Sequence, residues 1–104
     1  MKSNNTPSLE FLGSDKSTLK DFIRFFESKP AKTWCVDELK NNKGQRCAVG
    51  HLKVLEKNWM PYDRLRSLGV VCIISVNNGE GLPNRQKGIK TRVLNYLRSL
   101  GNPK

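Results

Sequence analysis

The sequence lacks the features of a disulfide-stapled scaffold and of a membrane-spanning chain. It has three cysteines among 104 residues, an odd number and a small one for a secreted scaffold. Its longest apolar run covers only residues 70–74, far short of the roughly 20 residues that span a bilayer. No apolar segment after Met1 resembles a secretory signal. We therefore expect a reduced, cytoplasmic protein with one domain and no membrane contact.

Acidic residues are also scarce, and their distribution is uneven. The chain has 19 Lys and Arg residues against 9 Asp and Glu residues, which gives a formal net charge of +10. The charges cancel over residues 1–28, so the whole excess lies in residues 29–104, and residues 81–104 contain no acid. An anionic partner would relieve the self-repulsion of such a surface. The charge therefore predicts a nucleic acid or an acidic protein as the partner.

The spacing of apolar residues predicts a mainly α-helical fold, a compact bundle of about four helices over residues 14–104. Residues 1–13 are mostly polar and are expected to form a flexible N-terminal arm. The predicted helical regions are residues 14–28, 47–57, 61–68 and 86–100. The candidate N-cap residues of the first helix are Ser14, Asp15 and Ser17. The expected core consists of Leu19, Phe22, Ile23, Phe26, Trp34, Leu52, Leu55, Leu65, Ile73, Val93, Leu97 and Leu100.

Residues 33–48 are compatible with two local structures. A turn signal spans residues 41–44, and its flanks fit either a short β-hairpin or a turn that leads into the second helix. Gly50, inside that helix, costs up to about 1 kcal/mol relative to alanine. We interpret this glycine as a position where another backbone, or a bulky ring such as that of Trp34, packs close to the helix.

Cys47 and His51 form the pair most able to carry chemistry. On one helix, their spacing of four residues would place them on the same face. They fit a buried structural cysteine beside a half-exposed histidine, two metal ligands, or an activated thiol nucleophile. A zinc site would need Cys35 and Cys72 as well, and the wide separation of the three cysteines disfavours it. We expect the structural role, with no catalytic residue, metal or cofactor.

The C-terminal part of the chain is the preferred binding site. The polar loop within residues 77–88 leads into the last helix, whose N-terminal N–H groups favour an anion. Cations at that end oppose the helix dipole unless an anion joins them. A solvated basic face that binds nothing specific is the alternative. The predicted anion-binding or nucleic-acid-binding residues are Asn78, Arg85, Lys87, Lys90, Arg92 and Arg98.

A resemblance to a known family rests on the following residues: Trp34, the run Cys47-Ala48-Val49-Gly50-His51-Leu52, the pair Asn77-Asn78, and Val93-Leu94 with Leu97. From about Leu19 to Leu100 the chain resembles an uncharacterised family of short bacterial and phage-encoded domains. His51 stands where that family has alanine, and Asn77-Asn78 stands where it has Asn-Asp. The resemblance implies a compact, mainly helical domain in a phage or mobile-element setting, and it supplies no catalytic residue.

Together these features predict a small basic binding module that engages nucleic acid or an acidic protein surface through residues 77–88 and the last helix. Two alternatives stay open. One is a small enzyme or metal protein centred on Cys47 and His51. The other is an inhibitor of a host protein.

Overall fold

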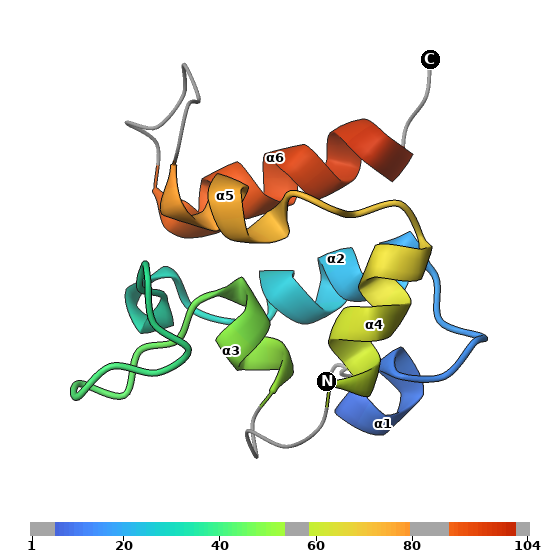
Figure 1. The fold of residues 1–104 in the computed structure, drawn as a ribbon, viewed down its shortest axis with the longest axis horizontal. Coiled ribbons are helices and arrows are strands. Elements are labelled where there is room, and N and C mark those ends of the chain that lie inside the picture. Colours follow the sequence, from blue (N-terminus) through green and yellow to red (C-terminus); the bar gives the residue numbers. More distant parts are fainter. Residues whose placement is uncertain (1–5, 54–58, 80–87, 102–104) are drawn as a thin grey trace, which may run out of the picture.

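The protein is built from short α-helices around one apolar core (Figure 1). The computed structural model describes residues 6–53, 59–79 and 88–101. Within these ranges it contains six α-helices and one 3-10 helix, η1. They are α1 (Leu9–Leu12), α2 (Leu19–Glu27), η1 (Ala31–Thr33), α3 (Ala48–Leu52), α4 (Met60–Ser67), α5 (Ile73–Asn78) and α6 (Ile89–Gly101). The mainly helical fold predicted from the sequence is confirmed.

The longest helix, α6, packs against both α2 and α5, whereas α3 packs against α5 and α4 (Figure 1). Most predicted core residues lie in the interior. Leu100 is an exception, because Val93, Leu94 and Leu97 take the buried positions of α6 and leave Leu100 exposed. Leu55 lies outside the described residues. The buried core consists of Leu12, Phe22, Phe25, Phe26, Trp34, Ala48, Val49, Leu52, Leu65, Val70, Ile73, Val76, Val93, Leu94 and Leu97.

Part of the predicted N-terminal arm is helical. Ser8 caps α1 by accepting a hydrogen bond from the Phe11 N–H at 3.1 Å. Leu12 is fully buried, and α1 packs against α4 (Figure 1). The docking of α1 places the N-terminal end of α4 beside Gly13, where an added Cβ would lie 2.9 Å from the Cβ of Met60.

Residues 34–47 form an irregular loop with two isolated bridges, Trp34 with Arg46 and Lys40 with Arg46, and no strand occurs within the described ranges. The predicted turn is confirmed, because Asn41 accepts from the Gly44 N–H at 3.1 Å through its carbonyl. The loop lies directly on α3 at Gly50. A Cβ on Gly50 would sit 1.9 Å from the carbonyl oxygen of Leu39. The close neighbour of this glycine is therefore the loop backbone.

The predicted second helix is shorter than expected in its described part. Its helical conformation ends at Leu52, and Lys53 has the non-helical angles φ −113° and ψ 51°. The rest of the predicted range, residues 54–57, lies outside the described residues. No helix in the described ranges is long and apolar enough to cross a bilayer.

Candidate ligand-binding pocket

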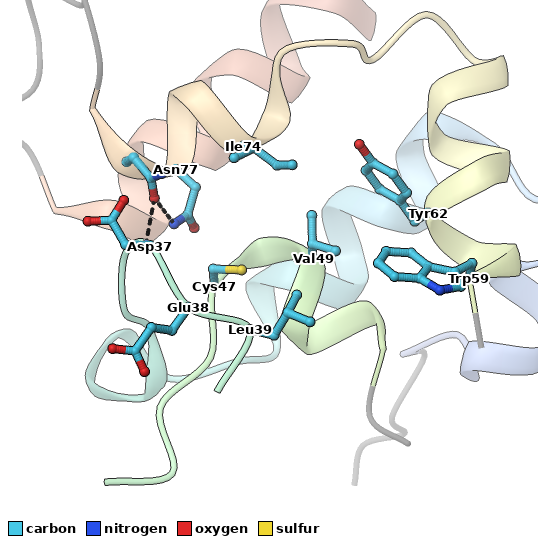
Figure 2. A pocket seen from close by; sticks show the side chains of 10 residues that line it. Asp37, Glu38, Leu39, Cys47, Val49, Trp59, Tyr62, Ile74 and Asn77 are labelled. Atoms are coloured by element: carbon cyan, nitrogen blue, oxygen red, sulfur yellow. Dashed lines mark hydrogen bonds between the residues drawn. The ribbon is translucent and has the colours of Figure 1, made fainter. Parts of the chain in front are cut away.

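A pocket of about 480 Å³ opens where the 34–47 loop, α3, α4 and α5 meet (Figure 2). This volume falls in the range of about 300–1,000 Å³ that is usual for small-ligand sites. One end is aromatic, and apolar side chains lead from it to the 34–47 loop and the end of α5 (Figure 2). The lining residues are Asp37, Glu38, Leu39, Cys47, Val49, Trp59, Tyr62, Ile74, Asn77 and Asn78.

The aromatic end is formed by Trp59 and Tyr62, whose ring centroids lie 5.8 Å apart. Trp59 is 43% exposed, and Ile74 beside the same pocket is 50% exposed. The buried side chain of Lys53 places its Nζ 3.6 Å from the centroid of the Trp59 ring. A cation–π contact of this kind holds the ring in place. The aromatic wall is therefore partly fixed before any ligand arrives.

The opposite end of the pocket is built on a constrained backbone. Asp37 adopts φ 68°, a left-handed conformation that is uncommon outside glycine and is tolerated best by Asn and Asp. Its N–H donates to Oδ1 of Asn78 at 3.0 Å, which holds the loop in this conformation. Asp37 and Glu38 lie at this end, and both exposed carboxylates point away from the cavity (Figure 2).

Asn77 ties three walls of the pocket together. Its side chain is 1% exposed, and its Oδ1 accepts from the Ala48 N–H at 3.0 Å. Its Nδ2 donates to the Cys35 carbonyl at 3.0 Å and to Asn78 Oδ1 at 3.1 Å. One buried amide therefore links α5 to the start of α3 and to the loop. A buried polar group that makes all these bonds fixes one arrangement of the surrounding backbone.

Cys47 and His51 take different positions relative to the pocket. Cys47 lines it and caps α3, with Sγ accepting from the Gly50 N–H at 3.4 Å. His51 does not line it; the ring is 5% exposed and packs 4.7 Å from the Trp34 ring. Burial lowers the pKa of His51 to about 4, and nearby Lys29 adds to this shift. A neutral interior imidazole of such low pKa is a weak base for a thiol at neutral pH.

The buried histidine also has an unsatisfied nitrogen. Within the described part of the chain, Nε2 of His51 has no hydrogen-bond partner. The three cysteines differ in their exposure to solvent. Cys35 is buried, Cys47 is half-buried and Cys72 is exposed. Burial raises the pKa of the Cys35 thiol, with a smaller contribution of the same sign from Cys47. Within residues 6–53, 59–79 and 88–101, no group of three or more His, Cys, Asp or Glu side chains is placed to hold a metal ion.

The predicted anion-binding residues that the structure describes all have partners within the protein. Arg85 and Lys87 lie outside the described residues. Lys90 donates from Nζ to the Glu27 carbonyl at 2.9 Å, and Arg98 forms a salt bridge with the Glu27 carboxylate. Asn78 uses Oδ1 at the pocket instead.

Arg92 departs furthest from its predicted place. It is 6% exposed, and its Nε and Nη2 donate to the carbonyls of Val76 and Asn77 at 3.1 and 2.6 Å. The guanidinium therefore satisfies the C-terminal carbonyls of α5. A signal for this was present in the sequence, since Arg92 is three residues after Ile89 and four before Tyr96, both on the apolar stripe of this helix. Its position marks it as an interior arginine.

No local sequence pattern identifies the pocket, because its walls come from segments that are distant in the chain. Trp59 and Tyr62 are about twenty residues from Asp37 and Glu38, and nothing in the local pattern pairs them. The one local signal was Trp59 itself, a large apolar residue at a break between helices. Comparisons of this chain with protein-family models, with curated proteins and with solved structures found no match.

Proposed function

We propose that this protein is a non-catalytic binding module that takes a small organic ligand with an apolar or aromatic body in the pocket between α3, α4 and α5. The observation that carries this proposal is the exposure of Trp59 and Ile74 around a concave surface. Large apolar side chains gathered at a hollow mark a binding site. Covering them gains about 25 cal/mol for each Å² of apolar surface removed from water.

The rigidity of the walls supports the same proposal. Asn77 braces the loop, α3 and α5, and Lys53 holds the Trp59 ring. A preformed pocket loses little conformational entropy when a ligand enters. Catalysis is not part of the proposal, because Cys47 is the one thiol at the pocket and the only histidine lies in the interior with a lowered pKa.

The test uses indole as a neutral aromatic probe and Cys47 as a reporter inside the pocket. In the Cys72→Ser variant the exposed thiol is removed, and Cys35 is buried with a raised pKa, so iodoacetamide should react mainly at Cys47. We expect indole to slow this alkylation in a saturable way. Unchanged alkylation up to the solubility limit of indole would reject the proposal.

The two tryptophans provide an internal control for the same titration. The Trp59 ring lines the pocket, whereas the buried Trp34 donates from Nε1 to the Lys29 carbonyl at 3.3 Å. In ¹H–¹⁵N spectra, indole should shift the side-chain N–H signal of Trp59 and leave that of Trp34 in place. Equal shifts of both signals would indicate general denaturation or non-specific binding. The Trp59→Ala variant should lose the protection of Cys47.

A second candidate function is binding of an anionic partner such as nucleic acid. The net charge of +10 favours it, together with the exposed Lys20 and Arg24, which lie one turn apart on α2. Glu27, one further turn along, pairs with Arg98 of α6, which brings this cation to the same side of α2. A labelled DNA duplex should then bind with an affinity that falls steeply from 50 to 200 mM salt. The Lys20→Ala/Arg24→Ala variant should lower the salt slope by about two. No binding at 50 mM salt, or an affinity that does not change with salt concentration, would reject this candidate.

A further inference from the structure

We infer that Cys35 and Cys47 form a reversible disulfide by exchange with a low-molecular-weight disulfide such as glutathione disulfide. The bond would join the 34–47 loop to the residue that caps α3. Both thiols are free in the structure, so the disulfide is the state expected when the ratio of glutathione disulfide to glutathione rises. The inference does not depend on the ligand proposed for the pocket.

The backbone places the two cysteines side by side. Trp34 and Arg46 form a parallel bridge. The Arg46 N–H donates to the Thr33 carbonyl at 2.9 Å, and the Arg46 carbonyl accepts from the Cys35 N–H at 3.0 Å. Cys35 and Cys47 are the next residues on the two sides of this bridge. Adjacent chains in a ladder lie about 4.8 Å apart, and the two Cα atoms of a disulfide usually lie about 4.4–6.8 Å apart, so these positions suit a disulfide.

The side-chain amide of Asn77 extends the same pairing by one step. In a parallel ladder, the next bond would run from the Ala48 N–H to the Cys35 carbonyl. Asn77 joins these two groups, because its Oδ1 accepts from the Ala48 N–H at 3.0 Å and its Nδ2 donates to the Cys35 carbonyl at 3.0 Å. The two chains are therefore tied together on both sides of the cysteine pair, once directly and once through a buried amide.

The two sulfur atoms lie in the same region of the fold. Paired residues in a ladder project their side chains to the same side, because side chains alternate in step along both chains. Sγ of Cys35 lies 3.4 Å from the carbonyl oxygen of Gln45, two residues before Cys47. Burial raises the pKa of the Cys35 thiol, and the Cys47 thiol raises it further, as expected for neighbouring groups that would both carry negative charge.

The two cysteines differ in the roles that they can take. Cys47 is half-buried and lines the pocket, so a disulfide in solution can reach it (Figure 2). Cys35 is buried, and its raised pKa disfavours the thiolate that exchange requires. Cys35 therefore reacts with a disulfide that Cys47 brings beside it, where the reaction is intramolecular.

The exchange proceeds in two steps that balance. Cys47 first loses its proton to water, and its thiolate attacks one sulfur of glutathione disulfide, which forms a mixed disulfide and releases one glutathione thiolate. Cys35 then loses its proton to water, and its thiolate attacks Sγ of Cys47 and releases the second glutathione thiolate. Two protein thiols are oxidised, and one glutathione disulfide is reduced to two thiols.

The test uses the full-length Cys72→Ser protein, which lacks the exposed third thiol. The protein is equilibrated with mixtures of glutathione and glutathione disulfide, the remaining thiols are blocked, and the chain is digested with trypsin. Trypsin cleaves after lysine and arginine, so it leaves the two cysteines in separate peptides, residues 33–40 and 47–53. We expect mass spectrometry to find these two peptides joined, and to find them separate after reduction.

The folded protein should favour this bond more than the unfolded chain does. In concentrated urea, only a flexible segment holds the two cysteines together, with an effective concentration in the millimolar range. At a fixed glutathione mixture, we expect the ratio of disulfide to dithiol to be at least about tenfold higher in the native protein than in urea. An equal or lower ratio in the native protein would overturn the inference.

Two matched variants separate proximity from general thiol reactivity. Cys35→Ser/Cys72→Ser keeps Cys47 alone and should stop at the mixed disulfide with glutathione. Cys47→Ser keeps the buried Cys35 and the exposed Cys72 and should give no intramolecular disulfide. The wild-type protein should yield the same joined peptides, which keeps the inference testable if Cys72→Ser does not fold. Accumulation of the mixed disulfide at Cys47 in place of the joined peptides, or an equal yield of intramolecular disulfide in Cys47→Ser, would show that the inference is wrong.

Discussion

The stability of this protein should fall when the pH is lowered from 7 to 5, because of a single residue. His51 is the only histidine in the chain and is buried against Trp34. Burial, with contributions from Lys29 and Arg46, lowers its pKa from 6.5 to about 4. Asp and Glu side chains of ordinary pKa titrate mostly below this range. The effect of pH between 7 and 5 can therefore be assigned to one imidazole.

The sign and size of the effect follow from proton binding. Below pH 6.5 the unfolded chain binds a proton at His51, whereas the folded protein stays neutral there until the pH approaches 4. Each pH unit in this window removes about 1.4 kcal/mol when one proton is taken up fully on unfolding. Because protonation of the unfolded chain is only partial near pH 6.5, the expected loss from pH 7 to 5 is about 2 kcal/mol.

Urea unfolding followed by circular dichroism at pH 7, 6 and 5 measures this loss directly. The His51→Leu variant is the control, since it removes the titrating group and also the unpartnered Nε2. At pH 7 the variant loses the ring contact with Trp34, which lowers the free energy of unfolding. It also no longer buries an unpaired nitrogen, which raises the free energy of unfolding. The two effects should cancel to within about 1 kcal/mol. Its stability should change little between pH 7 and 5.

An independent readout keeps the prediction testable if this variant does not fold. The imidazole C–H signal of the wild-type protein should show no titration above pH 5 by NMR. A titration midpoint near 6.5, or an equal loss of stability in wild type and His51→Leu, would refute the reasoning.

Three further predictions concern the helices. Gly50→Ala should destabilise the protein by about 2–3 kcal/mol in urea unfolding, because the new Cβ meets the Leu39 carbonyl, whereas helix propensity alone predicts a gain of about 1 kcal/mol. At Gly88 an added Cβ would meet no atom of the described residues within 4 Å, so Gly88→Ala should change stability by less than about 1 kcal/mol; a similar effect at both sites would contradict the close contact at Gly50. Arg92→Met should cost about 2–3 kcal/mol, since it removes the arginine donor from the Asn77 carbonyl and one of the two donors from the Val76 carbonyl, and a neutral effect would show that the Asn77 carbonyl finds another partner. Thr18→Ala should lower the unfolding free energy by about 1 kcal/mol by removing the capping box with Asp21; no change would exclude a contribution from the cap.

Local patterns predicted those parts of the fold that local forces determine. The stripes that include Phe22 and Val93 identify α2 and α6, and Gly69 ends α4 with φ 98°, as a glycine after a helix should. The cap of α2 was missed, although Thr18 and Asp21 form the pattern of a capping box in the sequence. Ser14, Asp15 and Ser17 are also suitable N-cap types in the sequence. In the structure the cap is Thr18.

The candidate site could not be predicted in the same way, because it depends on long-range contacts. Asn77 is an ordinary polar residue in the sequence, and only the folded chain brings it to Ala48 and Cys35. Arg92 is basic and was therefore assigned to the surface, yet its side chain is buried where carbonyls of α5 need donors. Charge predicts the environment of a residue poorly when the backbone supplies its partners.

The walls of the pocket fall into two parts, which are anchored to different elements of the molecule. Asn77 secures the 34–47 loop to α3 and, through its own carbonyl and Arg92, to α6. The aromatic part belongs to α4, where Arg64 donates to the Ser17 carbonyl at 2.7 Å, just before α2. The two parts meet where α3 packs against α4, so the packing of this seam sets the width of the cleft. Substitutions in this seam would change the width of the cleft without altering any group that lines it.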